Sequence, residues 1–194
     1  MNISLILICN LILSWLITKF IIKPFKVIIP DIPNQRSSHN IIKPRGGGLS
    51  FIIANLITSN IFSQANFLFL IPLSITGFID DFLNISRWLR LIVQIGTSGF
   101  ILFESNYFDF LKSTNNLIIE FFLISILIFI CTGIINFCNF MDGIDGILSG
   151  SILVFYIFAS FLFSNSILGI SGALLGFLLW NWQPSKIFMG DVGS

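Results

Sequence analysis

Two polar clusters interrupt a chain that is rich in Ile, Leu and Phe. The first is "IDDF", which contains Asp80 and Asp81. The second is "NFCNFMDGIDGI" at residues 136–147, whose polar side chains follow at three-residue steps: Asn136, Asn139, Asp142 and Asp145. In a helical segment these four side chains lie near one face. Amide and carboxylate oxygens are ligands suited to Mg²⁺, so this cluster predicts a metal site rather than an ordinary capped loop.

The adjacent acids Asp80 and Asp81 have two interpretations. Two close carboxylates raise each other's pKa or share a cation, so one of them is a candidate general base. Alternatively, they are solvated residues at a helix N-terminus, where Asp is favoured by the helix dipole. The pair alone does not decide between these interpretations.

Two glycine-rich segments are candidates for contacts with phosphate. "PRGGG" at residues 44–48 offers the backbone N–H groups of Gly46 and Gly47, with Arg45 beside them. Such stretches often bind phosphate, although glycine triplets also form simple flexible turns. "FMGDVGS" at residues 188–194 adds Asp191, again flanked by glycine.

The elements that position these residues are apolar segments. The chain has 194 residues, of which 55% are hydrophobic and 10% charged, with 23 Phe and a mean hydropathy of +0.96. Apolar runs occupy residues 3–22, 49–62, 67–79, 88–103, 117–135, 147–163 and 167–182. They predict an all-α, polytopic transmembrane helix bundle of about seven spans, forming one integral membrane domain over residues 1–194. The runs at 49–62 and 67–79 are short, and form either thin spans or a re-entrant hairpin.

The distribution of Lys and Arg predicts the orientation of the bundle. The loops at residues 23–48, 80–87, 136–146 and 183–194 share one side. With Lys19 and Arg90 at span ends, that side carries nine of the ten Lys and Arg residues, and only Lys112 lies opposite. Cytoplasmic loops are enriched in these residues, so we expect these four loops in the cytoplasm and the N-terminus outside. The polar clusters would then meet at the cytoplasmic mouth of the bundle.

Acidic and glycine-rich loops that meet basic residues at a membrane surface favour a polyphosphate bound through a divalent metal. The enzyme class that fits is one acting on a lipid phosphate. A secondary transporter or ion channel is the alternative from another class. Transporter carboxylates usually lie near the bilayer midplane, whereas the predicted spans here lack charges except near their ends.

Four segments together resemble one known family: "RSSHNIIKPRGGG", "DDFLNISRWLRLIVQ", "NFCNFMDGIDG" and "FMGDVGS". Their order and spacing are similar to those of the polyprenyl-phosphate N-acetylhexosamine-1-phosphate transferases of glycosyltransferase family 4. The first loop is most similar to the O-antigen-initiating branch, except that Lys43 stands where that branch often has Thr. The resemblance covers nearly the whole chain.

The resemblance implies a reaction and a location. An N-acetylhexosamine-1-phosphate would pass from a UDP-N-acetylhexosamine to undecaprenyl phosphate with release of UMP, which initiates a cell-envelope polysaccharide such as the lipopolysaccharide O-antigen. The enzyme would be a multi-pass protein of the bacterial inner (plasma) membrane with a cytoplasmic active site. Its partners would be these substrates and membrane lipids, without nucleic acid, and a homodimer is possible.

The resemblance also implies roles for individual residues. Asn139 and Asp191 would hold Mg²⁺ on the pyrophosphate. Asp80 would be the base for the lipid phosphate, with Asp81 supporting it. Arg90 would contact phosphate.

The nucleotide site is implied in the same way. Asp145 would receive the uracil edge, and Phe188, as an exposed aromatic, would stack on the ring. Asp142, Asn136 and Arg45 would shape the nucleotide and phosphate sites.

One departure from the family is large. Its members have more spans and a further cytoplasmic loop with a His-rich motif, whereas this chain stops at Ser194 in "GDVGS". We therefore expect a domain that is incomplete at its C-terminus. The alternative function is that of an inactive fragment of such an enzyme.

Overall fold

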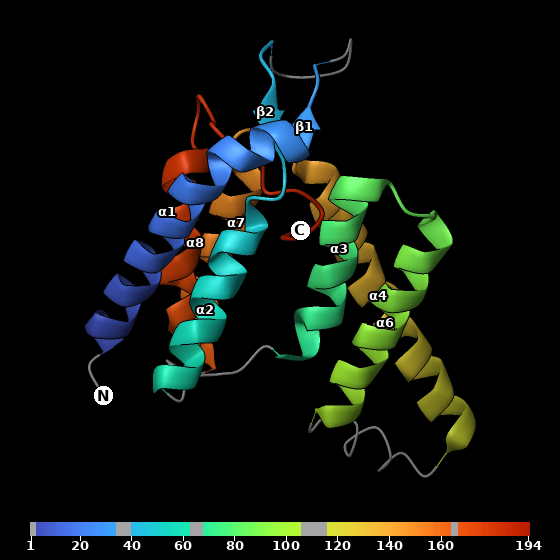
Figure 1. Ribbon diagram of the computed structural model, residues 1–194. Coiled ribbons are helices and arrows are strands. Elements are labelled where there is room, and N and C mark those ends of the chain that lie inside the picture. The colour runs from blue at the N-terminus through green and yellow to red at the C-terminus, as the bar shows by residue number, and fades with distance from the viewer. Residues whose placement is uncertain (1–2, 34–39, 63–67, 106–115, 164–166) are drawn as a thin grey trace.

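The structure is a computed structural model that describes residues 3–33, 40–62, 68–105, 116–163 and 167–194. Its helices are α1 (Ile3–Ile28), α2 (Gly48–Phe62), α3 (Ile71–Leu83), α4 (Arg87–Glu104), α6 (Leu117–Met141), α7 (Ile147–Leu162) and α8 (Leu168–Asn181), with a short 3₁₀ helix, η1 (Leu68–Leu70), before α3. Each predicted apolar run overlaps one of the α-helices (Figure 1). The prediction of an all-α membrane protein is confirmed.

The helices differ in their ability to cross a bilayer. Among the described residues, α1 and α6 are both long and apolar enough to span a membrane. The apolar helices α2, α7 and α8 are shorter. The number of seven spans therefore stays a prediction.

Three of the helices extend further than the apolar pattern indicated. The loops expected to begin at residues 23, 80 and 136 begin later, because α1 runs to Ile28, α3 to Leu83 and α6 to Met141. Pro24 lies inside α1, and the helix changes direction near this end (Figure 1), as expected where a proline removes a backbone hydrogen bond. Asn136 and Asn139 therefore lie on a helix, and only Asp142 and Asp145 follow it.

A short antiparallel strand pair, which the sequence did not predict, begins directly after α1. Strand β1 (Pro30–Asp31) pairs with β2 (Lys43–Pro44), with Pro30 opposite Pro44 and Asp31 opposite Lys43. The backbone N–H of Phe188 then donates to the carbonyl of Pro44 at 2.9 Å. The strand pair thereby joins the segment after α1 to the C-terminal loop at residues 183–194.

Helices α1 and α8 pack most closely, and glycine makes the contact possible. A Cβ atom on Gly172 would lie 2.4 Å from the carbonyl oxygen of Leu7, and one on Gly176 would lie 2.3 Å from that of Leu11. Gly172 and Gly176 are four residues apart and so share a helix face, the small-residue spacing that lets membrane helices approach each other. The two helices run parallel in this contact, because later residues of α8 meet later residues of α1.

Hydrogen bonds between polar side chains join α1 to α2 inside the apolar bundle. Thr18 donates to Ser50 at 2.8 Å, and Thr58 donates to the side-chain oxygen of Asn10 at 2.8 Å. All four residues are buried. Such pairs satisfy groups that would be costly to leave unpaired in hydrocarbon, so they fix the register of the two helices.

The polar loops gather at one end of the bundle. The β1–β2 pair, the α3–α4 turn, the α6–α7 turn and the C-terminal loop all lie at the upper end in Figure 1, where the C-terminus also lies among the helices. The structure thus brings together the loops that the sequence placed on one side.

We predict that Gly172→Ala destabilises the bundle, because the added methyl group would meet the backbone of Leu7, which cannot rotate away. Overpacking of this kind costs about 1–3 kcal/mol. The matched control is Gly150→Ala on α7, where a Cβ would meet no atom within 4 Å and the better helix former should be neutral or slightly stabilising. Thermal unfolding of the two variants in detergent, followed by fluorescence, measures the difference. Equal midpoints would contradict the packing argument.

Candidate functional site

Arg90 lies at the centre of the polar end of the bundle. The guanidinium Nη1 of Arg90, on α4, donates both to Asp80 Oδ2 and, at 2.6 Å, to Asp191 Oδ2. Asp80 also accepts the backbone N–H of Ile85 at 2.8 Å. One cation therefore joins α3 and α4 to the C-terminal loop.

Asp80 and Asp81 lie in the last turn of α3, which ends at Leu83. The alternative that placed them at a helix N-terminus is wrong. The dipole of the helix disfavours carboxylates at its C-terminal end, so other groups must stabilise them there. Arg90 does so for Asp80, and backbone N–H groups do so for Asp81.

Successive backbone N–H groups of the C-terminal loop bind two carboxylates. Gly190 N–H donates to Asp142 Oδ2 at 2.7 Å. Asp191 and Val192 donate to Asp81 Oδ1 and Oδ2 at 3.1 and 3.2 Å. Gly190 has a φ of +75°, which favours glycine, and a Cβ there would lie 2.4 Å from Asp81 Oδ2. The loop thus forms a concave array of donors of the kind that binds anions.

The carboxylates of this site form an acidic cluster of four residues: Asp80, Asp81, Asp142 and Asp191. They differ in protonation because their surroundings differ. Burial raises the pKa of Asp142 to about 7 and that of Asp81 to about 6. Hydrogen bonds from backbone N–H groups lower both pKa values, but by less than burial raises them. Burial also raises the pKa of Asp191 to about 7, together with its hydrogen bond to Asp80. For Asp80, burial is outweighed by hydrogen bonds to Asp191 and Arg90 and by the charge of Arg90, so its pKa lies below the ordinary value. Asp80 is thus the carboxylate most firmly ionised at neutral pH.

A small pocket brings Asn139 and Asp191 together. Both residues line it with Arg90, Gln94 and Ser194. The Ser194 hydroxyl donates to Asn139 Oδ1 at 2.5 Å. The two residues predicted to hold Mg²⁺ therefore border one space.

The amide of Asn136 points to Gln94 and not to this pocket. Asn136 Nδ2 donates to Gln94 Oε1 at 3.0 Å, and Gln94 Nε2 returns a longer bond of 3.4 Å. The sequence did not single out Gln94, which is buried on α4. This amide pair fixes α6 against α4, one turn from Asn139.

The oxygens in this pocket suit Mg²⁺, but they do not form a complete protein cage. Among the described residues there is no group of three His, Cys, Asp or Glu side chains placed to hold a metal ion. Mg²⁺ commonly binds through one or two protein oxygens, with water and substrate phosphate completing the shell. Asn139 and Asp191 fit that mode. The nearby carboxylates of Asp80, Asp81 and Asp142 carry more negative charge than Arg90 balances, which favours a bound cation.

Asp145 lies apart from the acidic cluster, in an ion pair with Lys43. Lys43 Nζ lies 3.2 Å from both carboxylate oxygens and 2.8 Å from Ser185 Oγ. Ser185 donates its own N–H and hydroxyl to Asp145 at 3.0 and 2.6 Å. Burial, which would raise the pKa of Asp145, is outweighed by these bonds to Ser185 and Lys43, so its pKa is lowered. The three-residue steps of the sequence do not therefore lead to one face, because the helix ends before Asp142.

Phe188 is buried, contrary to the expectation of an exposed aromatic. Its side chain is 4% exposed, and Lys43 Nζ lies 5.0 Å from the centre of its ring. Lys43 thus covers both residues that were assigned to the nucleobase, Phe188 and Asp145. The sequence could not predict that Lys43 is buried here, because its partner Asp145 is 102 residues away along the chain.

The glycine triplet packs backbone against backbone. Gly47 N–H donates to the carbonyl of Phe188 at 2.9 Å, and Gly48 N–H to that of Met189 at 2.8 Å. Cβ atoms at these positions would collide with Phe188 and Gly193. The expectation that this loop offers open N–H donors is therefore wrong for Gly47.

Arg45 is exposed and paired with Asp31, and Gly46 has a φ of +80°.

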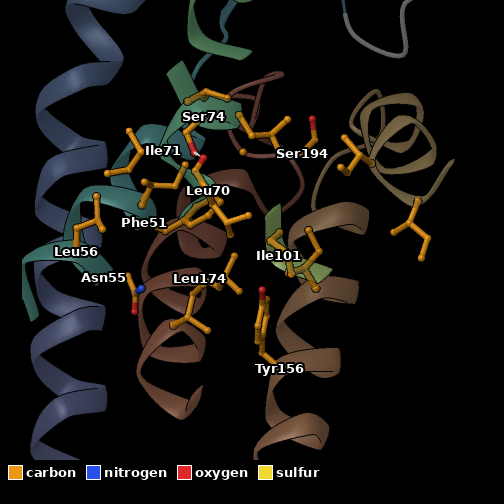
Figure 2. Close-up of a pocket in the computed structure, with 18 of the residues that line it drawn as sticks. Phe51, Asn55, Leu56, Leu70, Ile71, Ser74, Ile101, Tyr156, Leu174 and Ser194 are labelled. Carbon is orange, nitrogen blue, oxygen red and sulfur yellow. Dashed lines mark hydrogen bonds between the residues drawn. The ribbon is translucent and has the colours of Figure 1, made fainter. Parts of the chain in front are cut away.

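An apolar cavity of about 370 Å³ adjoins the small polar pocket. Figure 2 shows Phe51, Leu174 and Ile101 on its walls, with Ser194 at one edge. Ser194, Leu73 and Ile135 line both spaces. The site thus combines acidic, basic and amide groups with an adjacent hydrocarbon-lined space.

We predict that Asp142→Asn stabilises the protein more at about pH 8 than at about pH 5. A carboxyl group with a pKa raised from 3.8 to about 7 keeps its proton in the folded state while the unfolded chain loses it. The folded state therefore loses stability as the pH rises between these values, and Asn removes this loss. Thermal midpoints of variant and wild type, measured in chelator, provide the comparison.

The matched control is Asp145→Asn, because the lowered pKa of Asp145 keeps that group ionised in both states at either pH. Its effect on stability should be unfavourable and nearly the same at both pH values. A pH-independent effect of Asp142→Asn would show that this carboxyl is not protonated in the folded protein.

We further predict that Lys43→Met lowers the free energy of unfolding by about 3 kcal/mol, because it leaves Asp145 charged and enclosed. The side chains of Lys43 and Asp145 are only 7% and 17% exposed. Arg45→Met is the control, since the side chain of Arg45 is 45% exposed and its loss should cost about 1 kcal/mol or less. Denaturant titrations would measure both. The double variant Lys43→Met/Asp145→Asn should recover part of the loss; no recovery would contradict the pairing.

The sequence is similar to a family of glycosyl transferases and to several bacterial members described as sugar-phosphate transferases. The sequence model described as "Glycosyl transferase family 4" matches residues 63–194. A phospho-N-acetylmuramoyl-pentapeptide-transferase of Thermoanaerobacter sp. (strain X514) is 34% identical, over 78% of this chain and 56% of its own length. A relative with the same description in Staphylococcus aureus (strain bovine RF122 / ET3-1) is 29% identical, over 92% of this chain and 70% of its own.

A probable undecaprenyl-phosphate N-acetylglucosaminyl 1-phosphate transferase of Bacillus subtilis (strain 168) is 29% identical, over 92% of this chain and 57% of its own length. The chain thus spans a little over half the length of several of these relatives. The family match includes the acidic pair, the α6–α7 turn and the C-terminal loop, and confirms the resemblance inferred from the motifs. The chain belongs to glycosyl transferase family 4.

Proposed function

We propose that the protein transfers an N-acetylhexosamine-1-phosphate from a UDP-sugar to undecaprenyl phosphate, as an enzyme of the bacterial inner membrane with its active site on the cytoplasmic side. The observation that carries the proposal is the convergence of Asp80, Asp81, Asp142 and Asp191 on one loop, beside Arg90 and Asn139. The relatives are described as transferases of this kind, which supports the reaction class.

The reaction is a displacement at phosphorus. An oxygen of the lipid phosphate forms a bond to the β-phosphorus of the UDP-sugar, and the bond from that phosphorus to the bridging oxygen breaks. UMP leaves with the electron pair. Such a step depends on positioned reactants and on stabilisation of charge. Mg²⁺ held by Asn139 and Asp191 would neutralise the pyrophosphate.

The protein's own residues supply positioning and proton transfer. Arg90 is a cation already directed at the acidic cluster, and would contact a phosphate oxygen that enters the small pocket. The family resemblance implies Asp80 as the base for the lipid phosphate. The structure makes Asp81 a second candidate, because a pKa of about 6 is closer to that of an effective base near neutral pH.

The cavity beside the pocket supports a lipid acceptor. Its lining is largely apolar, and Ser194 connects it to the polar groups. A phosphate joined to a hydrocarbon chain could place its head at Arg90 and the start of its chain in this cavity. The nucleobase would bind near Asp145 and Phe188, which requires Lys43 to move from its position over the ring.

A role in O-antigen synthesis rests on the first loop alone. The described relatives carry out two different transfers, and Lys43 departs from the residue expected in the O-antigen branch. The proposal therefore specifies the reaction class, with the sugar to be identified by assaying individual UDP-N-acetylhexosamines.

We predict that Asp191→Asn lowers turnover at least about 100-fold and raises the Mg²⁺ concentration needed for half-maximal rate, because one of two protein metal ligands loses its charge. The assay follows radiolabelled undecaprenyl phosphate with a UDP-sugar in vesicles. Glu104→Gln is the control, because Glu104 is exposed at the opposite end of α4 from Arg90. Unchanged Mg²⁺ dependence in Asp191→Asn would exclude this residue as a ligand.

A second readout does not depend on turnover. UMP binding to the purified chain, measured by calorimetry with Mg²⁺ and with chelator, should be stronger with Mg²⁺. If UMP binds but no lipid-linked sugar forms, the result supports the nucleotide site and contradicts transferase activity of this chain. If neither is observed, the proposed function is wrong.

A further inference from the structure

A pair of tryptophans lies at the end of the α1–α8 seam that carries the polar loops. The rings of Trp15 and Trp180 are 5.5 Å apart, and Trp180 Nε1 donates to the carbonyl of Trp15 at 3.2 Å. Each ring has an ammonium group above it. Lys19 Nζ lies 5.3 Å from the Trp15 ring centre, and Lys186 Nζ lies 4.8 Å from that of Trp180.

Two further lysines extend this cluster along α1. Lys19 and Lys23 follow Trp15 at four and eight residues and so share its helix face, and Lys26 lies further along α1, past Pro24. Lys19, Lys23, Lys26 and Lys186 are all exposed. Among the described residues, the recorded salt bridges involve Lys43, Arg45 and Arg90, and none involves these four lysines. This lysine–tryptophan patch, defined by these four lysines with Trp15 and Trp180, therefore has an uncompensated positive charge.

The patch is continuous with an apolar surface. Ile8 and Ile12 lie on the same face of α1, further along the predicted span, and their side chains are 54% and 50% exposed. Tryptophan is favoured at the boundary between lipid and water, where long lysine side chains also place their charges. A ligand that matches the patch therefore has a negative head at the boundary and an apolar chain below it.

We propose that the lysine–tryptophan patch binds the headgroup of an anionic phospholipid. The phosphodiester contacts the ammonium groups of Lys19 and Lys186, and an acyl chain lies along Ile8 and Ile12. Basic sites between membrane helices are known to select anionic headgroups, and each lysine near the surface contributes about fivefold to affinity.

The patch is separate from the proposed transferase site. It lies on α1, on the end of α8 and at Lys186, whereas the acidic cluster joins α3, α4 and the turn after α6 to residues 190–192 of the C-terminal loop. Helices α3, α4 and α6 lie on the other side of the bundle from α1 (Figure 1). Lys186 is nevertheless next to Ser185, which contacts Asp145. A headgroup bound at Lys186 would thus hold the outer edge of the C-terminal loop.

The experiment measures lipid binding to the purified full chain by native mass spectrometry, with phosphatidylglycerol or phosphatidylcholine added at fixed ratios. We expect phosphatidylglycerol to bind more tightly, with its affinity reduced about fivefold in Lys186→Gln and more than about tenfold in Lys19→Gln/Lys186→Gln. Arg87→Gln is the matched control, because Arg87 is an exposed cation at the start of α4, away from the patch. It should leave the affinity unchanged.

Competition distinguishes the sources of phosphate. Excess inorganic phosphate should not displace phosphatidylglycerol, and undecaprenyl phosphate should bind equally well to wild type and double variant. The proposal is overturned if Arg87→Gln reduces binding as much as Lys186→Gln, or if both phospholipids bind alike. It is also overturned if inorganic phosphate displaces the lipid, which indicates a free-anion site, or if the double variant loses undecaprenyl phosphate, which indicates the substrate site. None of these measurements requires turnover.

Discussion

The structure depends on the satisfaction of buried backbone N–H groups in a loop that enters the helix bundle. Residues 188–190 and Val192 are buried among the ends of the helices, and Asp191, Gly193 and Ser194 are half-buried there. Buried N–H groups must find partners. Those of Gly190, Asp191 and Val192 find them in the carboxylates of Asp142 and Asp81. Glycine makes the approach possible, since a Cβ on Gly77 would lie 2.1 Å from the Asp191 carbonyl oxygen. The same contacts that hold the loop therefore assemble the acidic groups.

This arrangement concentrates more negative charge than its cation balances. Asp80 and Asp191 share Arg90, whereas Asp81 and Asp142 rely on backbone dipoles. Protons compensate in part, as the raised pKa values of Asp81, Asp142 and Asp191 show. A divalent cation would compensate more completely at neutral pH. The electrostatic demand for such an ion is thus a consequence of how the loop is held.

Sequence patterns predicted the helices well and the details of the site less well. The apolar runs located all the α-helices of the described residues, because burial in lipid requires long apolar segments. They misplaced the ends of α1, α3 and α6, since nothing in the pattern marks where a helix emerges from the bilayer. The three-residue spacing correctly grouped Asn139 with the acidic loop but not Asp145, because the helix ends at Met141. Lys43 and Gln94 were missed because their partners are distant in sequence, and only the fold brings them together.

The parallel contact of α1 and α8 has a consequence for the order of assembly. The hydrogen bond from Trp180 to Trp15 joins residues 165 positions apart. During synthesis α1 emerges long before α8, so it must remain without this partner while the intervening helices are inserted. Its polar residues Asn10 and Thr18 can meanwhile pair with α2. The surface of α1 against which Gly172 packs is thus formed early and covered late, and the C-terminal loop, which follows α8 directly, reaches its place only after α8 has docked. Acidic residues that would repel one another therefore come together only after α8 has packed against α1.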